Sequence, residues 1–196
     1  FDLRDPVKAN AGLKGMQAVA HCAGPFSATS QPMIDACLAT HCHYLDITGE
    51  IEVFVAAQKR HAEAEAADIV ICSGVGFDVI PTDCIAATLK TELPDADRLA
   101  LGFDSRSGFS PGTAKTSVEG LKYGGKVREK DKIRTVPLAW QSREIDFGNG
   151  TKHAVTIPWG DIATAWYSTG IDNIEVFIPM APSAATRLRR LDKLRP

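Results

Sequence analysis

The sequence predicts an α/β protein in which a partial Rossmann-type parallel sheet is followed by an α+β region with a mixed, largely antiparallel sheet. Over residues 1–94, short apolar runs alternate with helical patterns, as they do in βαβ units. After Pro94 the apolar residues alternate with a period of two. Gly148-Asn149-Gly150 then separates two further strand patterns, as in a β-hairpin. We therefore expect two domains, residues 1–94 and 95–196.

The first domain is predicted to contain three strands and three helices. Residues 18–23 are nearly all apolar, which is typical of a strand buried on both faces, and residues 43–47 and 69–72 form two more strands. We expect the first helix to begin at an N-cap, Ser30, with Pro32 in its first turn. A longer helix should run from Phe54 to about Ala67, and a third from about Pro81 to Leu93.

The second domain shows more strand patterns than helical ones. Leu99, Leu101 and Phe103 alternate with Arg98, Ala100 and Gly102, which predicts a half-exposed antiparallel strand, and residues 174–178 predict another. A hairpin is expected across residues 144–157. A helix should begin near Thr113.

Composition limits the functions of the chain. With 22 Lys+Arg against 24 Asp+Glu in 196 residues, it has no net attraction for nucleic acid or anionic membrane. A hydrophobic content of 44% excludes intrinsic disorder, and no apolar run approaches the ~20 residues of a membrane helix. The five cysteines are an odd count and most lie in apolar or helical patterns, which predicts a reducing, cytoplasmic environment without disulfides.

The three predicted strand ends are the candidate binding site. Parallel sheets bind ligands beyond the carboxyl ends of their strands, which here are residues 22–26, 46–50 and 73–78. The same residues equally suit ordinary turns between strand and helix. Four carboxylates near these ends are candidates for proton transfer: Asp46, Glu50, Asp78 and Asp83. Helix capping is the alternative role for these side chains, and it is favoured for Asp83.

A phosphate-binding glycine loop is missing from the sequence. Gly74-Val75-Gly76 is followed by Val79 where a third glycine belongs, and it follows the third strand instead of the first. Any such loop is expected upstream of Phe1, so we expect the chain to be a fragment. Residues 18–23 would then form a bare sheet edge prone to aggregation.

Four further groups of residues have two interpretations each. Cys37, His41, Cys42 and His43 suggest zinc, but adjacent side chains diverge, so no metal is expected. Residues 107–113, with Arg106 and Lys115, predict either an anion-anchoring loop or a plain capping loop. Trp159, Trp166 and Tyr167, expected on loops, would line a pocket or close the core. The basic residues 186–196 would contact a membrane surface or, as we favour, form a packing helix.

Several segments resemble the saccharopine dehydrogenase-like oxidoreductases, a family whose relatives include the trans-acting enoyl reductases of lipid biosynthesis. The resemblance covers nearly the whole chain. Its strongest segments are residues 21–26, 35–38, 43–50 and 74–84, with residues 112–114, 118–120 and 156–161 in the second half. Relatives usually carry Gly at the position of His41, where the helix ends in a left-handed turn.

The resemblance implies a Rossmann domain that binds NADP(H) or NAD(H) and an α+β domain for substrate and self-association, which makes a homodimer plausible. It implies that residues 23–26 lie along the cofactor crevice and that residues 48–50 and 76–78 face the reacting centre. The residues implied to bind the cofactor are Cys22, Ala23, Gly24, Pro25, Phe26, Thr48 and Gly76. Substrates differ within the family, so lysine metabolism is not implied.

Two functions follow from these observations. The first is an NAD(P)-dependent oxidoreductase that transfers hydride to or from a small or lipid-like substrate, with this chain inactive alone because it lacks the phosphate loop. The second is a non-catalytic module that docks to a partner enzyme or a membrane surface. The sequence leaves open the substrate, the direction of reaction, the choice between NADP and NAD, and the oligomeric state.

Overall fold

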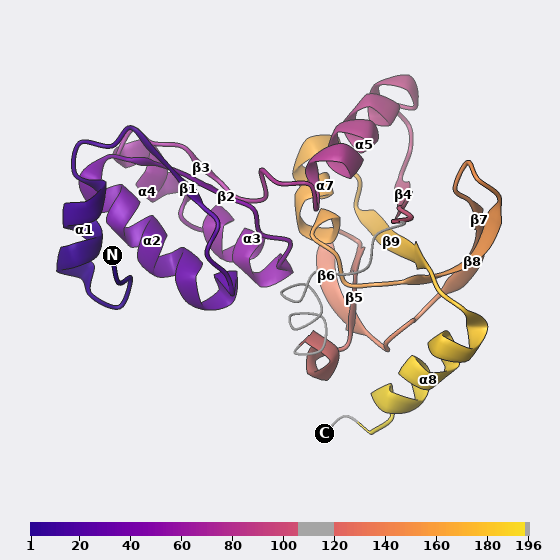
Figure 1. Cartoon of the computed structure of the whole chain (residues 1–196). Coiled ribbons are helices and arrows are strands. Elements are labelled where there is room, and N and C mark those ends of the chain that lie inside the picture. Colours follow the sequence, from indigo (N-terminus) through magenta and orange to yellow (C-terminus); the bar gives the residue numbers. More distant parts are fainter. Residues whose placement is uncertain (106–119, 195–196) are drawn as a thin grey trace. The chain divides into compact units, whose positions relative to one another are not determined.

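The computed structural model describes residues 1–105 and 120–194 and divides into two compact units, Phe1–Pro81 and Thr82–Pro196 (Figure 1). The first unit holds a parallel sheet, and the second holds a mixed sheet in which most pairs of strands are antiparallel. The predicted fold class is therefore confirmed. The functional boundary at residue 94 stays a prediction.

The sheet of the first unit has the order β1-β2-β3, with strands at Ala18–His21, His43–Asp46 and Ile71–Cys72. All the pairs are parallel. Helix α2 (Phe26–Thr40) connects β1 to β2, while α3 (Ile51–Gln58) and α4 (His61–Ala66) connect β2 to β3. The three predicted strands are confirmed, although each is shorter than its apolar run because the turns begin inside that run.

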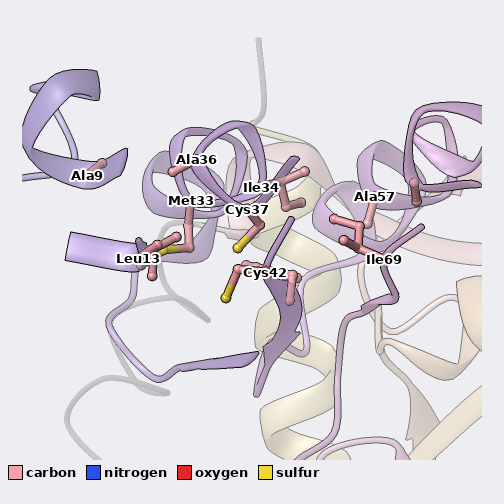
Figure 2. Close-up of a cluster of buried hydrophobic side chains, with 11 residues drawn as sticks. Ala9, Leu13, Met33, Ile34, Ala36, Cys37, Cys42, Ala57 and Ile69 are labelled. Carbon is pink, nitrogen blue, oxygen red and sulfur yellow. The ribbon is translucent and has the colours of Figure 1, made fainter. Parts of the chain in front are cut away.

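The core of the first unit lies on one face of this sheet. Tyr44 on β2 is fully buried there, among side chains from all four surrounding helices, which include α1 (Pro6–Leu13). Figure 2 shows the thiols of Cys37 and Cys42 inside this cluster, beside Met33 and Leu13. Burial raises the pKa of Cys37 to about 12, so the thiol stays protonated and behaves as a small apolar side chain.

The opposite face of the same sheet is exposed. Ala18, Ala20 and His43 alternate with the buried positions and are solvent-accessible in the described part of the chain. The prediction that the first strand is buried on both faces was therefore wrong for the described residues. An apolar run of alanines fits an exposed face as easily as a buried one, because the Ala side chain is so small.

Helix α2 begins five residues earlier than the sequence suggested. Its first residue is Phe26, so Ser30 is a buried interior residue and not the N-cap, and Pro32 lies inside the helix. Its last turn has the expected left-handed form, with His41 at φ 56° and the Cys42 N–H bonded to the carbonyl of Cys37. The His41 ring also bonds to the carbonyl of Ala67, at 2.8 Å, which ties the end of α2 to the end of α4.

The long helix predicted over residues 54–67 is two helices. The chain breaks at Lys59 and Arg60, where the Arg60 N–H bonds to the carbonyl of Ala57. The Arg60 guanidinium then holds the break through ion pairs with Asp35 and Glu63, at 2.8 and 2.5 Å. Helix α1, which the sequence analysis did not predict, begins at an Asp5 N-cap followed by Pro6.

The sheet of the second unit has the order β6-β5-β9-β8-β7, and β4 also pairs with β9. Strand β4 (Arg98–Gly102) runs parallel to β9 (Asn173–Pro179), so the prediction of an antiparallel strand was wrong. Alternating burial identifies a strand but carries no information about the direction of its neighbour. The predicted helix near Thr113 and the loop 107–113 with Arg106 and Lys115 lie outside the described residues.

Two hairpins complete this sheet. Strands β7 (Ser142–Asp146) and β8 (Thr151–Thr156) form the predicted one, with Gly148 and Gly150 at φ 82° and 116°. Strands β5 (Gly125–Glu129) and β6 (Lys132–Val136) form a second that was not predicted. Its turn places Lys130 and Asp131 at positive φ without any glycine, so the usual sequence signal is absent.

Helices α5 (Ile80–Glu92), α7 (Asp161–Thr169) and α8 (Pro182–Asp192) and the short 3₁₀ helix η1 (Leu121–Tyr123) complete the described elements. Trp166 and Tyr167 lie on α7, so their predicted place on a loop was wrong. The basic helix α8 packs through Ala185 and Leu188 against Val155. Among the described residues, no helix combines the length and the apolar character needed to cross a membrane.

Candidate functional site

The candidate site lies at the carboxyl edge of the parallel sheet in the first unit. The loops after β2 and β3 approach each other closely: a Cβ added to Gly49 would lie 2.7 Å from Oδ2 of Asp78, and one added to Gly76 would lie 3.0 Å from Cβ of Ile47. Both positions therefore exclude larger side chains. The glycines in these loops serve close packing between the loops.

Asp46, the last residue of β2, forms the centre of this edge. Its side chain is 1% exposed and accepts three hydrogen bonds: from the Thr48 N–H at 2.9 Å, the Gly74 N–H at 2.8 Å and the Tyr44 hydroxyl at 2.6 Å. Both carboxylate oxygens are thus occupied by donors of the protein itself. Asp46 joins the loops after β2 and β3, and this geometry favours a structural role over proton transfer.

Glu50 caps helix α2 from a distant part of the chain. Its two oxygens accept the backbone N–H groups of Phe26 and Ser27, each at 3.0 Å. Its own N–H donates to the hydroxyl of Thr48 at 3.0 Å. Free N–H groups at a helix N-terminus are satisfied by an acceptor, and here that acceptor comes from the loop after β2. The geometry fits the capping alternative.

His21, at the end of β1, was not singled out from the sequence. Its ring is 3% exposed, packs edge-on against Phe26 and lies 2.9 Å from the hydroxyl of Thr29. Because that hydroxyl donates to the carbonyl of Ala23 at 2.7 Å, it accepts from Nε2 of His21. Burial lowers the pKa of His21, although the nearby Asp46 charge opposes this. The ring is therefore a neutral donor that fixes the loop after β1.

Asp78 has the environment of a candidate acid. It lies against Gly49 in the loop after β3, and its side chain is partly exposed. Burial raises its pKa above the ordinary value for Asp, which moves the carboxyl group toward the range where it can release or accept a proton. Three of the four predicted carboxylates, Asp46, Glu50 and Asp78, thus lie in the loops at one sheet edge.

Asp83 belongs to the second unit. Its oxygens accept hydrogen bonds from the Thr164 and Ser168 hydroxyls of α7, at 3.2 and 2.5 Å. These bonds fasten α5 to α7. Since two donors from another helix hold this carboxylate, its place in the structure is that of a packing residue.

The residues expected to bind a cofactor differ in their exposure. Cys22, Ala23, Gly24 and Pro25 are exposed, and Phe26 and Gly76 are partly exposed. Thr48 is fully buried, with its hydroxyl bonded to Glu50. A Cβ on Gly24 would lie 3.6 Å from Cε2 of Phe26, an ordinary van der Waals contact, and Gly24 itself is exposed. A flat ring can approach such a segment, whereas the α2 N-terminus already holds the Glu50 carboxylate and does not fit a phosphate.

The Cys and His residues that suggested a zinc site pack in the core or form hydrogen bonds with the backbone. Cys37 and Cys42 are in the core, and Nδ1 of His43 accepts the Val70 N–H at 3.0 Å. Among the described residues, no three His, Cys, Asp or Glu side chains gather as metal ligands would.

The curated proteins to which the chain is similar are named saccharopine dehydrogenase-like oxidoreductases. The chain is 28% identical over 141 residues to a probable mitochondrial saccharopine dehydrogenase-like oxidoreductase of Arabidopsis thaliana, which covers 68% of this chain and 31% of that protein. It is 31% identical over 83 residues to the human saccharopine dehydrogenase-like oxidoreductase, covering 42% of this chain and 19% of the human protein. Over these segments the chain is similar to saccharopine dehydrogenase-like oxidoreductases. It spans less than a third of the length of these relatives.

The fold is similar to that of a solved saccharopine dehydrogenase. The structure matches apo saccharopine dehydrogenase (L-Glu forming) of Saccharomyces cerevisiae with a TM-score of 0.62, over 97% of this chain and 46% of that one. The sequence identity is 12%, so this likeness concerns the fold. No family model matches the sequence.

Proposed function

We propose that this chain carries the nicotinamide end of the cofactor site of an NAD(P)-dependent oxidoreductase. The observation that carries the proposal is the exposure of residues 22–25 at the carboxyl edge of a parallel sheet, the same edge at which the loop with Asp78 follows β3. The similarity to saccharopine dehydrogenase-like oxidoreductases supports it. Bound NAD(H) or NADP(H) would supply or accept the hydride.

The exposure of each residue at this edge determines its proposed role. Cys22, Ala23, Gly24 and Pro25 would contact the ring, with Phe26 and Gly76 at its border. Thr48 is buried, so it would act by holding Glu50 and, through it, the start of α2. The phosphates would be bound by groups outside residues 22–78, because Glu50 presents a negative charge at the α2 N-terminus.

Asp78 is the residue that we propose for proton transfer, ahead of Asp46, Glu50 and Asp83. Its raised pKa and partial exposure suit a group that exchanges a proton with substrate. Asp46 joins two loops, Glu50 caps α2, and Asp83 fastens α5 to α7, so these three carboxylates have structural roles. The proposed substrate is a small or lipid-like molecule. We further propose that the protein forms a homodimer and is located in the cytoplasm.

The test is titration of NADH and NADPH, followed by nicotinamide fluorescence. It compares the 196-residue chain with the protein at the full length that its gene encodes. We expect the full-length protein to bind and Gly24→Val to weaken its binding at least tenfold, because the added side chain would extend from this exposed segment into the proposed position of the ring. Gly120→Val is the control in the second unit, since a Cβ there meets no described atom within 4 Å. Equal binding by both variants contradicts the proposed position of the ring.

The alternative, a non-catalytic docking module, is favoured by one surface. Leu191 and Leu194 on and after α8 are 49% and 80% exposed and lie among the basic residues Arg187 and Arg190. Such a surface suits an anionic partner or membrane. If the full-length protein binds neither NADH nor NADPH, this alternative replaces the oxidoreductase.

A further inference from the structure

The second unit contains a cavity of about 470 Å³ on the face of its sheet that points away from α7. Leu99 and Ile174 pack with α7, so Ala100 and Gly102, which alternate with them along β4, face the other way and line the cavity. Its remaining walls come from β7 and the turn that follows. The volume lies in the range of about 300–1,000 Å³ that is common for small-molecule sites.

The floor of the cavity is formed around Gly102. A Cβ at this position would lie 3.3 Å from Cε1 of Phe147 and 3.7 Å from Cδ1 of Ile145. The side chains of Ile145 on β7 and of Phe147 after it therefore approach the β4 backbone at Gly102. A side chain larger than Gly would occupy part of the space.

Arg143 supplies the charge of the cavity. Its guanidinium carbon lies 4.8 Å from the centroid of the Phe177 ring, and Phe177 is fully buried beneath it. No described residue forms a hydrogen bond or ion pair with Arg143. Because the ring covers one face of the guanidinium, the planar group is held in place while its N–H donors are free to bind an anion.

The carboxylates of the cavity are engaged with other groups. Asp104 forms an ion pair with Lys152 at 2.5 Å, and Asp146 accepts the Gly148 N–H at 2.8 Å. They leave Arg143 as the cation available to a ligand among the described lining residues. Their negative charge nevertheless disfavours a dianion such as phosphate, so a ligand with a single negative charge fits best.

We propose that this cavity binds a small monocarboxylate with a short apolar body. The carboxylate would pair in the plane of the Arg143 guanidinium, and the apolar body would lie over Gly102 against Ile145 and Phe147. Every residue involved belongs to the second unit, so the proposal does not depend on nicotinamide binding.

Calorimetric titration of hexanoate into the 196-residue chain tests the proposal. A ligand of this size should bind with a Kd on the order of 1 mM. Arg143→Gln should weaken binding at least tenfold, because a charge-assisted pair is lost. Arg187→Gln, on the exposed face of α8, is the matched control and should leave the Kd unchanged. Hexylammonium, which has the same apolar chain and the opposite charge, should not bind.

Gly102→Val is an independent variant that tests the floor of the cavity, and it should also abolish hexanoate binding. The proposal is overturned if hexanoate shows no saturable binding, if Arg143→Gln binds as tightly as the unaltered chain, or if hexylammonium binds equally well. Thermal melts of each variant show whether it is folded. If either variant is unfolded, the comparison of hexanoate with hexylammonium in the unaltered chain still decides. Inorganic phosphate should bind more weakly than hexanoate, and tighter phosphate binding contradicts the choice of a monocarboxylate.

Discussion

The charged residues of the sheet edge in the first unit and Arg143 in the cavity of the second unit differ in their hydrogen bonds. At the sheet edge of the first unit, Asp46 and Glu50 accept hydrogen bonds from the backbone N–H groups of neighbouring loops and helices. In the cavity of the second unit, Arg143 lies over an aromatic ring and has no polar partner among the described residues. A charged residue at a promising position is therefore informative only when its own hydrogen bonds are known.

The strongest test of this contrast is Asp46→Ala. The substitution leaves the N–H groups of Thr48 and Gly74 and the Tyr44 hydroxyl without their buried acceptor. An unsatisfied buried polar group costs about 1–3 kcal/mol, so we expect a loss of about 3 kcal/mol, measured by urea unfolding. Asp46→Asn is the matched control and should lose much less, because its amide oxygen still accepts both N–H groups. Equal losses for Ala and Asn would mean that the carboxylate charge matters more than its hydrogen bonds.

Asp78→Asn tests the carboxylate proposed for proton transfer. For the proposed oxidoreductase activity of the full-length protein, we expect kcat to fall at least tenfold, about 1.4 kcal/mol of transition-state stabilisation. Turnover that is unchanged across the pH range removes Asp78 as the acid.

The raised pKa of Asp78 also has a consequence for stability. Between the ordinary value of 3.8 and the raised value, the folded protein binds more protons than the unfolded protein, so this group lowers stability as pH rises. We expect Asp78→Asn to gain stability relative to the unaltered protein when the pH rises from below 3.8 to neutral. A Tm difference that does not change with pH contradicts the raised pKa.

Glu50→Ala should have a smaller effect, about 1 kcal/mol, because it removes an N-cap from α2. Glu50→Gln keeps one oxygen as an acceptor and should lose about half as much. Helix α2 would also fray at Phe26, so amide exchange of Phe26 and Ser27 should accelerate in the Ala variant. Protection of both amides that is unchanged in Glu50→Ala shows that another group caps the helix.

The smallest expected effect concerns His21. Because burial lowers its pKa below 6.5, the unfolded chain takes up a proton as pH falls through 6.5 while the folded chain does not. The contribution of His21 to stability is therefore complete above that pH and is lost below it. The free energy of unfolding should fall less between about pH 7.5 and about pH 5.5 in His21→Phe than in the unaltered chain. The same fall in both proteins contradicts the lowered pKa.

The fold of the first unit was largely predictable from the sequence because each of its strands is followed by its own helix. What the sequence could not show was which residue caps a helix when the cap comes from another segment. Ser30 has a side chain suited to an N-cap but lies inside α2. The residue that accepts the Phe26 N–H is Glu50, which lies 24 residues further along the chain. His21 carried a weak signal, a polar residue at the end of an apolar run.

The second unit was harder to predict because its decisive partners are distant. The hairpin of β7 and β8 was found from its glycines, whereas the turn of β5 and β6 places Lys130 and Asp131 at positive φ without a glycine. Arg143 was not a sequence candidate, because an arginine in an exposed alternating strand resembles any other surface residue. Its role depends on Phe177, which lies on another strand.

The parallel pairing of β4 with β9 sets an order of folding. In the first unit, Ala18 pairs with His43, which is 25 residues further along the chain. In the second unit, Arg98 pairs with Asn173, which is 75 residues further along. Closing the longer loop costs about 1 kcal/mol more in chain entropy, and such long-range pairs form slowly. During synthesis, the first sheet can be complete before β9 has left the ribosome. The cavity around Gly102 and Arg143 can then form only when that last strand arrives.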